Sequence, residues 1–241
     1  MAGGPESRLE AQETLSVPER VWLEHSLIRH ERGDLHPCVA PHRMQNMEGK
    51  WVEAGKSLYD NQCAIRMGDA LKRAGVVFPP HILRQMLTCG AHPPGELHTL
   101  RAPELARGLA ILSETRSLPG FKPVQKLRGE AIKAFFSRIP SKPGIIYIQG
   151  YWRSIGEQGL NGGHIDMYNG YRTTAKSLNH TFNVVGCLPN YQHAQEVWFF
   201  EIEDDIVQRL LRRRADTTRE RTRFAHGGAE VTAAMGALSA S

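Results

Sequence analysis

Residues 61–75 read N-Q-C-A-I-R-M-G-D-A-L-K-R-A-G, and this stretch decides the first element of the fold. Its apolar residues recur at the i, i+4, i+7, i+8 and i+11 positions that share one helical face. They are Cys63, Met67, Ala70, Leu71 and Ala74. Asp60 or Asn61 provides an N-cap and Gly75 a C-cap. The pattern predicts a helix that carries a cysteine in its first turn.

Further helices and strands are predicted towards the C-terminus. A first-turn proline and helical spacing indicate a helix from Ala102 to about Leu112, and apolar residues indicate another near 125–138. Three later segments are short, rich in β-branched or aromatic residues, and bounded by turn-forming residues, as is typical of strands. They are GIIYIQG (144–150), GHIDMYNG (163–170) and EVWFFEI (196–202). Helices followed by strands predict an α+β fold with an antiparallel sheet.

The 241 residues are interpreted as one folded domain with two extensions. Residues 1–45 form a weakly ordered N-terminal arm with a candidate helix at 17–29, and residues 46–205 form the folded domain. Residues 206–241 form a basic helix and a disordered tail. The segment 207–223 holds seven arginines and two acidic residues, so its charge equals the formal net charge of +5 of the chain.

Composition excludes several classes of protein. With 41% hydrophobic and 23% charged residues, the chain is neither a disordered polyelectrolyte nor a membrane protein. No apolar run approaches the roughly 18 to 20 residues of a membrane span. The N-terminus, MAGGPESRLEAQETLSVPER, lacks the basic start and apolar run of a signal peptide, so synthesis in the cytoplasm is expected. The four cysteines are scattered without a C-x-x-C pair, which argues against a zinc finger, and no cofactor or metal is predicted.

Cys63 is the candidate nucleophile. Backbone N–H groups and the positive end of the helix dipole favour an anion in the first turn, so a thiol there is more acidic than usual. The backbone N–H of Cys63, with the side chain of Asn61 or Gln62, is the expected donor set for an oxyanion. The alternative is that Cys63 is a small buried residue on the apolar face.

His164 is the candidate general base, in a strand preceded by two glycines that leave room for a substrate backbone. Strand alternation places His164 and Asp166 on one face, where the carboxylate could fix the imidazole tautomer. The alternative is a surface histidine in a polar strand. His180, His193 and the N-terminal histidines are expected to be solvent-exposed.

The segments N-Q-C-A-I-R-M (61–67), with Leu71 after it, and G-H-I-D-M-Y-N-G (163–170) resemble the signature blocks of the type VI secretion amidase effector family 4. The strand EVWFFEI resembles the C-terminal strand of that family, and the resemblance spans roughly residues 50–203. It implies a papain-like, NlpC-related cysteine peptidase fold, in which N-terminal helices pack on an antiparallel sheet. Cys63 would be the nucleophile and His164 the general base.

The resemblance also implies a substrate, partners and a route. The substrate would be the γ-D-glutamyl–meso-diaminopimelate bond in Gram-negative peptidoglycan stem peptides. Type VI secretion machinery would deliver the enzyme, an antibacterial toxin, into the target-cell periplasm, which would explain the missing signal peptide. A cognate immunity protein would block the site in the producing strain.

One position departs from the family pattern, which places an Asp eleven residues after the His. Here that residue is Ala175, which faces His164 if Asn169-Gly170 forms a two-residue hairpin turn. Alanine cannot orient an imidazole, so another residue must do so. The candidates are Asp166, then Asn179 if the returning strand is bulged, and then Ser177.

Three other functions are compatible with these residues. A metal-dependent hydrolase could use His164, Asp166 and a further histidine such as His180, but no motif fixes the third ligand. The arginines of 207–223 could bind nucleic acid, yet they lack interleaved aromatic residues, so no nucleic-acid partner is predicted. Another thiol acyl-enzyme reaction, such as acyl transfer, could use the same fold.

Overall fold

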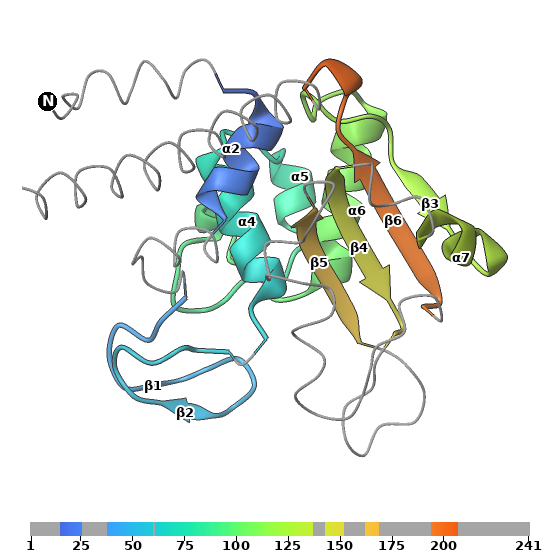
Figure 1. Cartoon of the computed structure of the whole chain (residues 1–241). Helices are drawn as coiled ribbons and strands as arrows, with labels where there is room; N and C mark the ends of the chain where they lie inside the picture. Colours follow the sequence, from blue (N-terminus) through green and yellow to red (C-terminus); the bar gives the residue numbers. More distant parts are fainter. Residues whose placement is uncertain are drawn as a thin grey trace, which may run out of the picture. The chain divides into compact units, whose positions relative to one another are not determined.

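The computed structural model describes the chain in six ranges, shown in colour in Figure 1. They are 15–25, 38–59, 61–136, 143–151, 162–168 and 194–206. The chain divides into two units, Met1–Glu203 and Asp204–Ser241, and the elements below belong to the first unit. The predicted basic helix and tail lie outside the described residues.

The described elements are helices followed by strands, as the sequence predicts. The helices are α2 (Val17–Glu24), α4 (Cys63–Arg73), α5 (Pro80–Leu83), α6 (Ala102–Glu114), α7 (Glu130–Phe136) and the 3-10 helix η1 (Pro94–Glu96). The strands are β1 (Met44–Gln45), β2 (Trp51–Val52), β3 (Gln125–Leu127), β4 (Gly144–Gln149), β5 (Gly163–Tyr168) and β6 (Glu196–Glu201). Every pairing between these strands is antiparallel, which confirms the α+β class.

The main sheet has the strand order β3-β6-β4-β5. β4 pairs with β6 on one side and with β5 on the other, so β5 is at the edge of the described sheet. The register places Ile148 opposite His164 and Ile146 opposite Asp166. The buried aliphatic strand β4 therefore fixes the position of β5 along its length.

Helix α4 confirms the prediction made from residues 61–75. Its apolar face is buried, with Met67, Ala70 and Leu71 all at 0% exposure. The helix ends at Arg73, and Gly75 follows with φ +85°. Only glycine adopts this left-handed conformation without strain, which is why the helix stops here.

The prediction of a helix near 125–138 is wrong at its N-terminal end. Residues 125–127 form strand β3, in which Gln125 lies opposite Phe199 of β6. Gly129, with φ +56°, separates the strand from α7, which begins at Glu130. Pairing with β6 overrides the local helical pattern in this segment.

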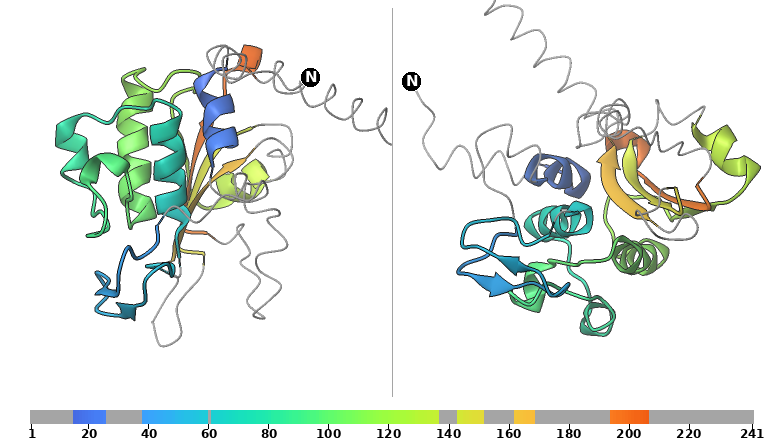
Figure 2. Two further views of the ribbon diagram at one scale, coloured as in Figure 1. Left: turned by 90° about the vertical axis from the view of Figure 1, so that its left-hand side faces the viewer. Right: turned by 90° about the horizontal axis from the view of Figure 1, so that it is seen from below.

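Helices cover both faces of the sheet. α6 packs against β4 and β5, and α4 packs against β5. Figure 2 shows α7 on the far side of the sheet from α6. There Ile132, Phe135 and Phe136 pack on an apolar cluster that includes Ile146, Ile148 and Phe199. None of the helices in the described part of the chain is long and apolar enough to cross a membrane.

Helix α2 packs on α4 and brings part of the N-terminal arm to the domain. Its N-terminus is closed by the Glu19 carboxylate, which accepts a hydrogen bond of 2.8 Å from the Ser16 N–H. Val21 is fully buried, and Arg20 Nε donates to the Ala74 carbonyl at 3.0 Å. These contacts place the C-terminal end of α2, at His25, beside the strand that carries His164.

Candidate active site

Cys63 is the first residue of α4, as predicted, and its side chain is half-buried. The N-cap residue is Gln62, and Asp60 lies outside the described residues. Asn61 instead contributes through its side chain, because Oδ1 accepts a hydrogen bond of 3.2 Å from the Cys63 N–H. The thiol therefore sits at the amino end of an eleven-residue helix, where the backbone favours a negative charge.

His164 and Asp166 lie together on β5. Nε2 of His164 is 3.6 Å from Oδ2 of Asp166, and their side chains are 18% and 3% exposed. The Met167 N–H donates to Asp166 Oδ1 at 2.8 Å, which fixes the carboxylate. The predicted same-face placement of these two residues is confirmed.

Cys63 and His164 change one another's pKa. Burial raises the pKa of the Cys63 thiol, but hydrogen bonding to His164, the charge of that imidazole and the Ile165 N–H lower it below its ordinary value overall. Burial lowers the pKa of His164, yet Asp166 and Cys63 raise it to about 10. Each residue therefore favours the charged form of the other: the imidazolium favours the Cys63 thiolate, and Cys63 and Asp166 favour the His164 imidazolium.

His25 is part of the same group, although the sequence interpretation placed the N-terminal histidines in solvent. That expectation is wrong for His25, which is 2% exposed because α2 packs against α4. Its Nε2 lies 3.7 Å from Oδ1 of Asp166. Burial lowers the pKa of His25 to about 4, so it is neutral near pH 7. No sequence motif pointed to it, since the contact depends on helix packing.

Arg66 completes the charge balance around Cys63. It lies on α4 three residues after the thiol and interacts electrostatically with both Cys63 and Asp166. Burial lowers the pKa of Arg66, whereas these two negative charges raise it. Arg66 thus adds a positive charge near the Cys63 thiol and the Asp166 carboxylate, and such pairing reduces the cost of burying each charge.

Gln62 does not supply an oxyanion donor, contrary to one of the alternatives drawn from the sequence. Its side chain is buried, and Nε2 donates to the Cys38 carbonyl at 3.1 Å and the Tyr59 carbonyl at 3.2 Å. Nε2 also hydrogen-bonds the Ser57 hydroxyl. These bonds occupy the two amide hydrogens, so Gln62 holds the start of α4 in place instead.

Several predicted residues lie outside the described residues. They are the hairpin turn Asn169-Gly170, Ala175, Ser177, Asn179, His180, His193 and Cys187. The roles assigned to Ser177 and Asn179 as alternatives to Asp166 stay predictions.

A second group of reactive side chains was not indicated by the sequence interpretation. One ligand atom from each of Cys38, Cys89, His92 and His98 lies within 4.8 Å of all the others. The spacing Cys89-x2-His92-x5-His98 is a weak signal that could have suggested it. The fourth residue, Cys38, is about fifty positions away in the chain, so only the fold brings it to the other three.

A comparison with protein-family profiles finds one that matches residues 59–200, more than half of the chain. It is Tae4, described as type VI secretion system amidase effector protein 4. The chain belongs to this family. The matched range includes Cys63, His164 and Asp166, so the Tae4 resemblance of the two sequence blocks is confirmed. No curated protein and no solved structure matches the chain significantly.

Proposed function

We propose that this Tae4 member is a cysteine amidase that cleaves the γ-D-glutamyl–meso-diaminopimelate bond of Gram-negative peptidoglycan. One arrangement supports the mechanism: Cys63 at the start of α4 interacts with His164, which lowers the pKa of the thiol, and His164 lies 3.6 Å from Asp166. A thiolate, an imidazole and an orienting carboxylate are the groups that papain-like hydrolases combine. Helices packed on an antiparallel sheet are compatible with that fold. The bond itself is proposed from the family.

The first step is attack of the Cys63 thiolate on the amide carbonyl carbon. Interaction with His164 lowers the pKa of the thiol, which raises the fraction of Cys63 that is present as thiolate at neutral pH. Nε2 of His164 faces Asp166. The other ring nitrogen, Nδ1, is therefore the one that interacts with the Cys63 thiol and donates a proton to the leaving amine. The His164 imidazolium then protonates the amine nitrogen as the C–N bond breaks.

The second step is hydrolysis of the thioester. His164, now neutral, takes a proton from water, and the resulting hydroxide attacks the acyl carbon and releases the Cys63 thiolate. Asp166 stays ionised throughout and stabilises the imidazolium each time it forms. The buried carboxylate therefore acts on the reaction only through His164.

The oxyanion of the tetrahedral intermediate needs a hydrogen-bond donor close to Cys63. The Cys63 N–H now donates to Asn61 Oδ1 at 3.2 Å. We propose that the substrate oxygen takes over this bond, and that the exposed Asn61 side chain turns its amide NH2 towards the same oxygen. Each lost donor of this kind typically costs about 10²- to 10³-fold in rate.

The biological setting is proposed from the family. The type VI machinery would deliver the enzyme to the periplasm of a competing cell, where stem peptides are accessible. A cognate immunity protein would bind over the half-buried Cys63 in the producing strain. No nucleic acid takes part.

Digestion of purified Gram-negative sacculi tests the function. Wild type is expected to release fragments newly cut between D-Glu and diaminopimelate, as identified by mass spectrometry. Cys63→Ala and His164→Ala are expected to fold normally and to lose at least ~10³-fold in rate, whereas Lys72→Ala on the exposed side of α4 is expected to remain active. Full activity of Cys63→Ala refutes the thiol mechanism, and cleavage of a different bond that still needs Cys63 refutes the substrate alone.

A further inference from the structure

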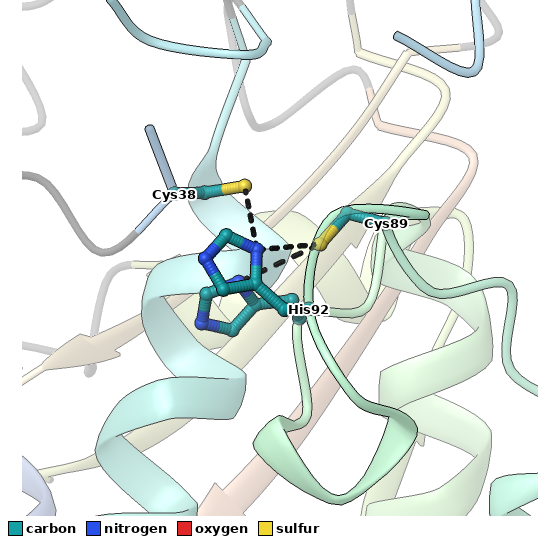
Figure 3. Close-up of side chains that lie close together, drawn as sticks. Cys38, Cys89 and His92 are labelled. Atoms are coloured by element: carbon teal, nitrogen blue, oxygen red, sulfur yellow. Dashed lines mark hydrogen bonds between the residues drawn. The ribbon is translucent and has the colours of Figure 1, made fainter. Parts of the chain in front are cut away.

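Two thiols and two imidazoles converge beside the start of α4. Figure 3 shows Cys38 and Cys89 pointing at the ring of His92. The four residues come from two separate segments: Cys38 precedes β1, and the other three lie in the loop between α5 and α6. Cys38 and Cys89 are free thiols in the described part of the chain. We propose that Cys38, Cys89, His92 and His98 bind one structural zinc ion.

The distances fit a tetrahedral zinc site. Cys89 Sγ lies 3.1 Å from Nδ1 of His92 and 3.6 Å from Nδ1 of His98. Cys38 Sγ lies 3.8 Å from Nδ1 of His92. With Zn–S bonds of about 2.3 Å and Zn–N bonds of about 2.0–2.1 Å, a tetrahedron separates sulfur and nitrogen ligands by roughly 3.6 Å. A small adjustment therefore places all four atoms at bonding distance from one ion.

Burial and charge favour the same ligand. Cys38 is 0% exposed, Cys89 1% and His98 2%, while His92 is partly buried. On binding, the two thiols lose their protons to solvent, and the two negative charges of the thiolates offset the charge of Zn²⁺, while the two imidazoles stay neutral. A neutral complex can be buried, whereas two isolated thiolates cannot. A soft, four-ligand set of this kind selects zinc over magnesium or calcium.

The backbone of the loop is held in the shape that this site requires. The Cys89 N–H donates to the His98 carbonyl at 2.9 Å, which brings the two ligands together. Between them, Leu97 adopts φ +53°, which is uncommon for a branched residue and costs energy. A metal bond from His98, the next residue, would offset that strain.

The site is structural and separate from the proposed reaction. All four positions of the ion are filled by protein, which leaves no position for a substrate. The Cys38 carbonyl accepts a hydrogen bond from Gln62 Nε2, one residue before Cys63. Zinc would thus hold the segment of Cys38 and the α5–α6 loop together next to the start of α4. It would also keep Cys38 and Cys89 from oxidising to a disulfide in the periplasm.

The test is metal analysis of the full-length protein expressed with added zinc. We expect about one zinc per chain, and after exchange with Co²⁺ we expect a thiolate-to-cobalt charge-transfer band. Two variants remove one ligand each: Cys38→Ser, and His92→Ala, which is chosen because His92 is partly buried. Each is expected to weaken Zn²⁺ binding at least ~10-fold in a chelator competition. Cys63→Ser and His81→Ala are matched controls that should keep the zinc, because Cys63 lies outside the cluster and His81 is exposed on α5.

The proposal fails if the folded wild type holds no stoichiometric zinc and Co²⁺ gives no charge-transfer band. It also fails if peptide mapping without reductant shows a Cys38–Cys89 disulfide in freshly isolated protein. Equal zinc affinity of His92→Ala, Cys38→Ser and wild type would likewise refute these ligands. Because the readout is metal content, each result stands whether or not the protein cleaves peptidoglycan.

Discussion

Asp166 Oδ2 lies 3.6 Å from Nε2 of His164, on the same strand and two residues further along. The family resemblance implies an orienting carboxylate eleven residues after the histidine, at the position that Ala175 occupies here. Residues i and i+2 of a strand point to the same side, so a carboxylate at 166 can reach the imidazole without the neighbouring strand. The geometry therefore supports Asp166 as the orienting residue.

Cys63 is expected to react with iodoacetamide below the pH range of ordinary thiols. Its lowered pKa raises the thiolate fraction at a given pH, and thiolates are the reactive form. The labelling rate of Cys63, followed by peptide mapping at a series of pH values, should reach half of its maximum at a lower pH in the wild type than in His164→Ala. Coincident pH profiles of the two proteins would show that His164 does not lower the pKa of the Cys63 thiol.

Asp166→Asn is expected to keep the fold and to lose about 10²- to 10⁴-fold in kcat. Asparagine can still accept the Met167 N–H, but it cannot stabilise the imidazolium. Because Asp166 helps to raise the pKa of His164 to about 10, its loss should move the alkaline limit of activity to lower pH. The measurement is kcat against pH on soluble stem peptides.

The control for Asp166→Asn is Asp69→Asn on α4, a second buried carboxylate that is held by Arg73 Nε at 2.9 Å. It should lower stability without moving the alkaline limit. If Asp166→Asn instead keeps its kcat and its pH profile, the orienting residue is another one, and Asn179 and Ser177 are the next to substitute.

His25 is expected to make the fold sensitive to acid. The pKa of His25 is about 4 in the folded chain, against an ordinary value of 6.5. Between these two pH values the unfolded chain binds a proton at His25 and the folded chain does not. Stability is therefore fully present above about pH 6.5 and falls as the pH drops towards 4. The measurement is the free energy of unfolding in urea at pH 7 and at pH 4.5. The loss of stability between these two pH values should be smaller by about 2 kcal/mol in His25→Gln than in the wild type.

The matched control for His25 is His81→Gln, since His81 is exposed on α5. This variant should retain the full acid sensitivity of the wild type. An unchanged pH dependence in His25→Gln would show that His25 is not held neutral by burial.

Gly68→Ala is expected to destabilise the protein by at least about 2 kcal/mol. An added Cβ would lie 2.0 Å from the Leu97 carbonyl oxygen, so α4 and the loop before His98 would have to separate. Gly95→Ala is the control, because nothing lies within 4 Å of its added Cβ. Thermal unfolding of the two variants measures the difference, and equal stability would mean that the loop does not pack tightly on α4.

Local patterns predicted the elements that are regular by themselves. Helices α4 and α6 and strands β4, β5 and β6 follow from residue spacing and from bounding turn residues. β3 is a strand although its local pattern predicts helix, because three residues carry little periodicity and their conformation is set by the partner strand β6. The short β1–β2 pair was missed for the same reason.

Residue spacing alone predicts that a cysteine begins a helix and that His164 and Asp166 share a strand face, because both facts depend only on the period of a single element. Three contacts depend on how the elements pack: His25 with Asp166, Gln62 with the Cys38 carbonyl, and Cys38 with Cys89, His92 and His98. Those contacts join segments tens of residues apart. They exist because burying the apolar faces of α2, α4 and the α5–α6 loop together outweighs the entropy of ordering the chain between them.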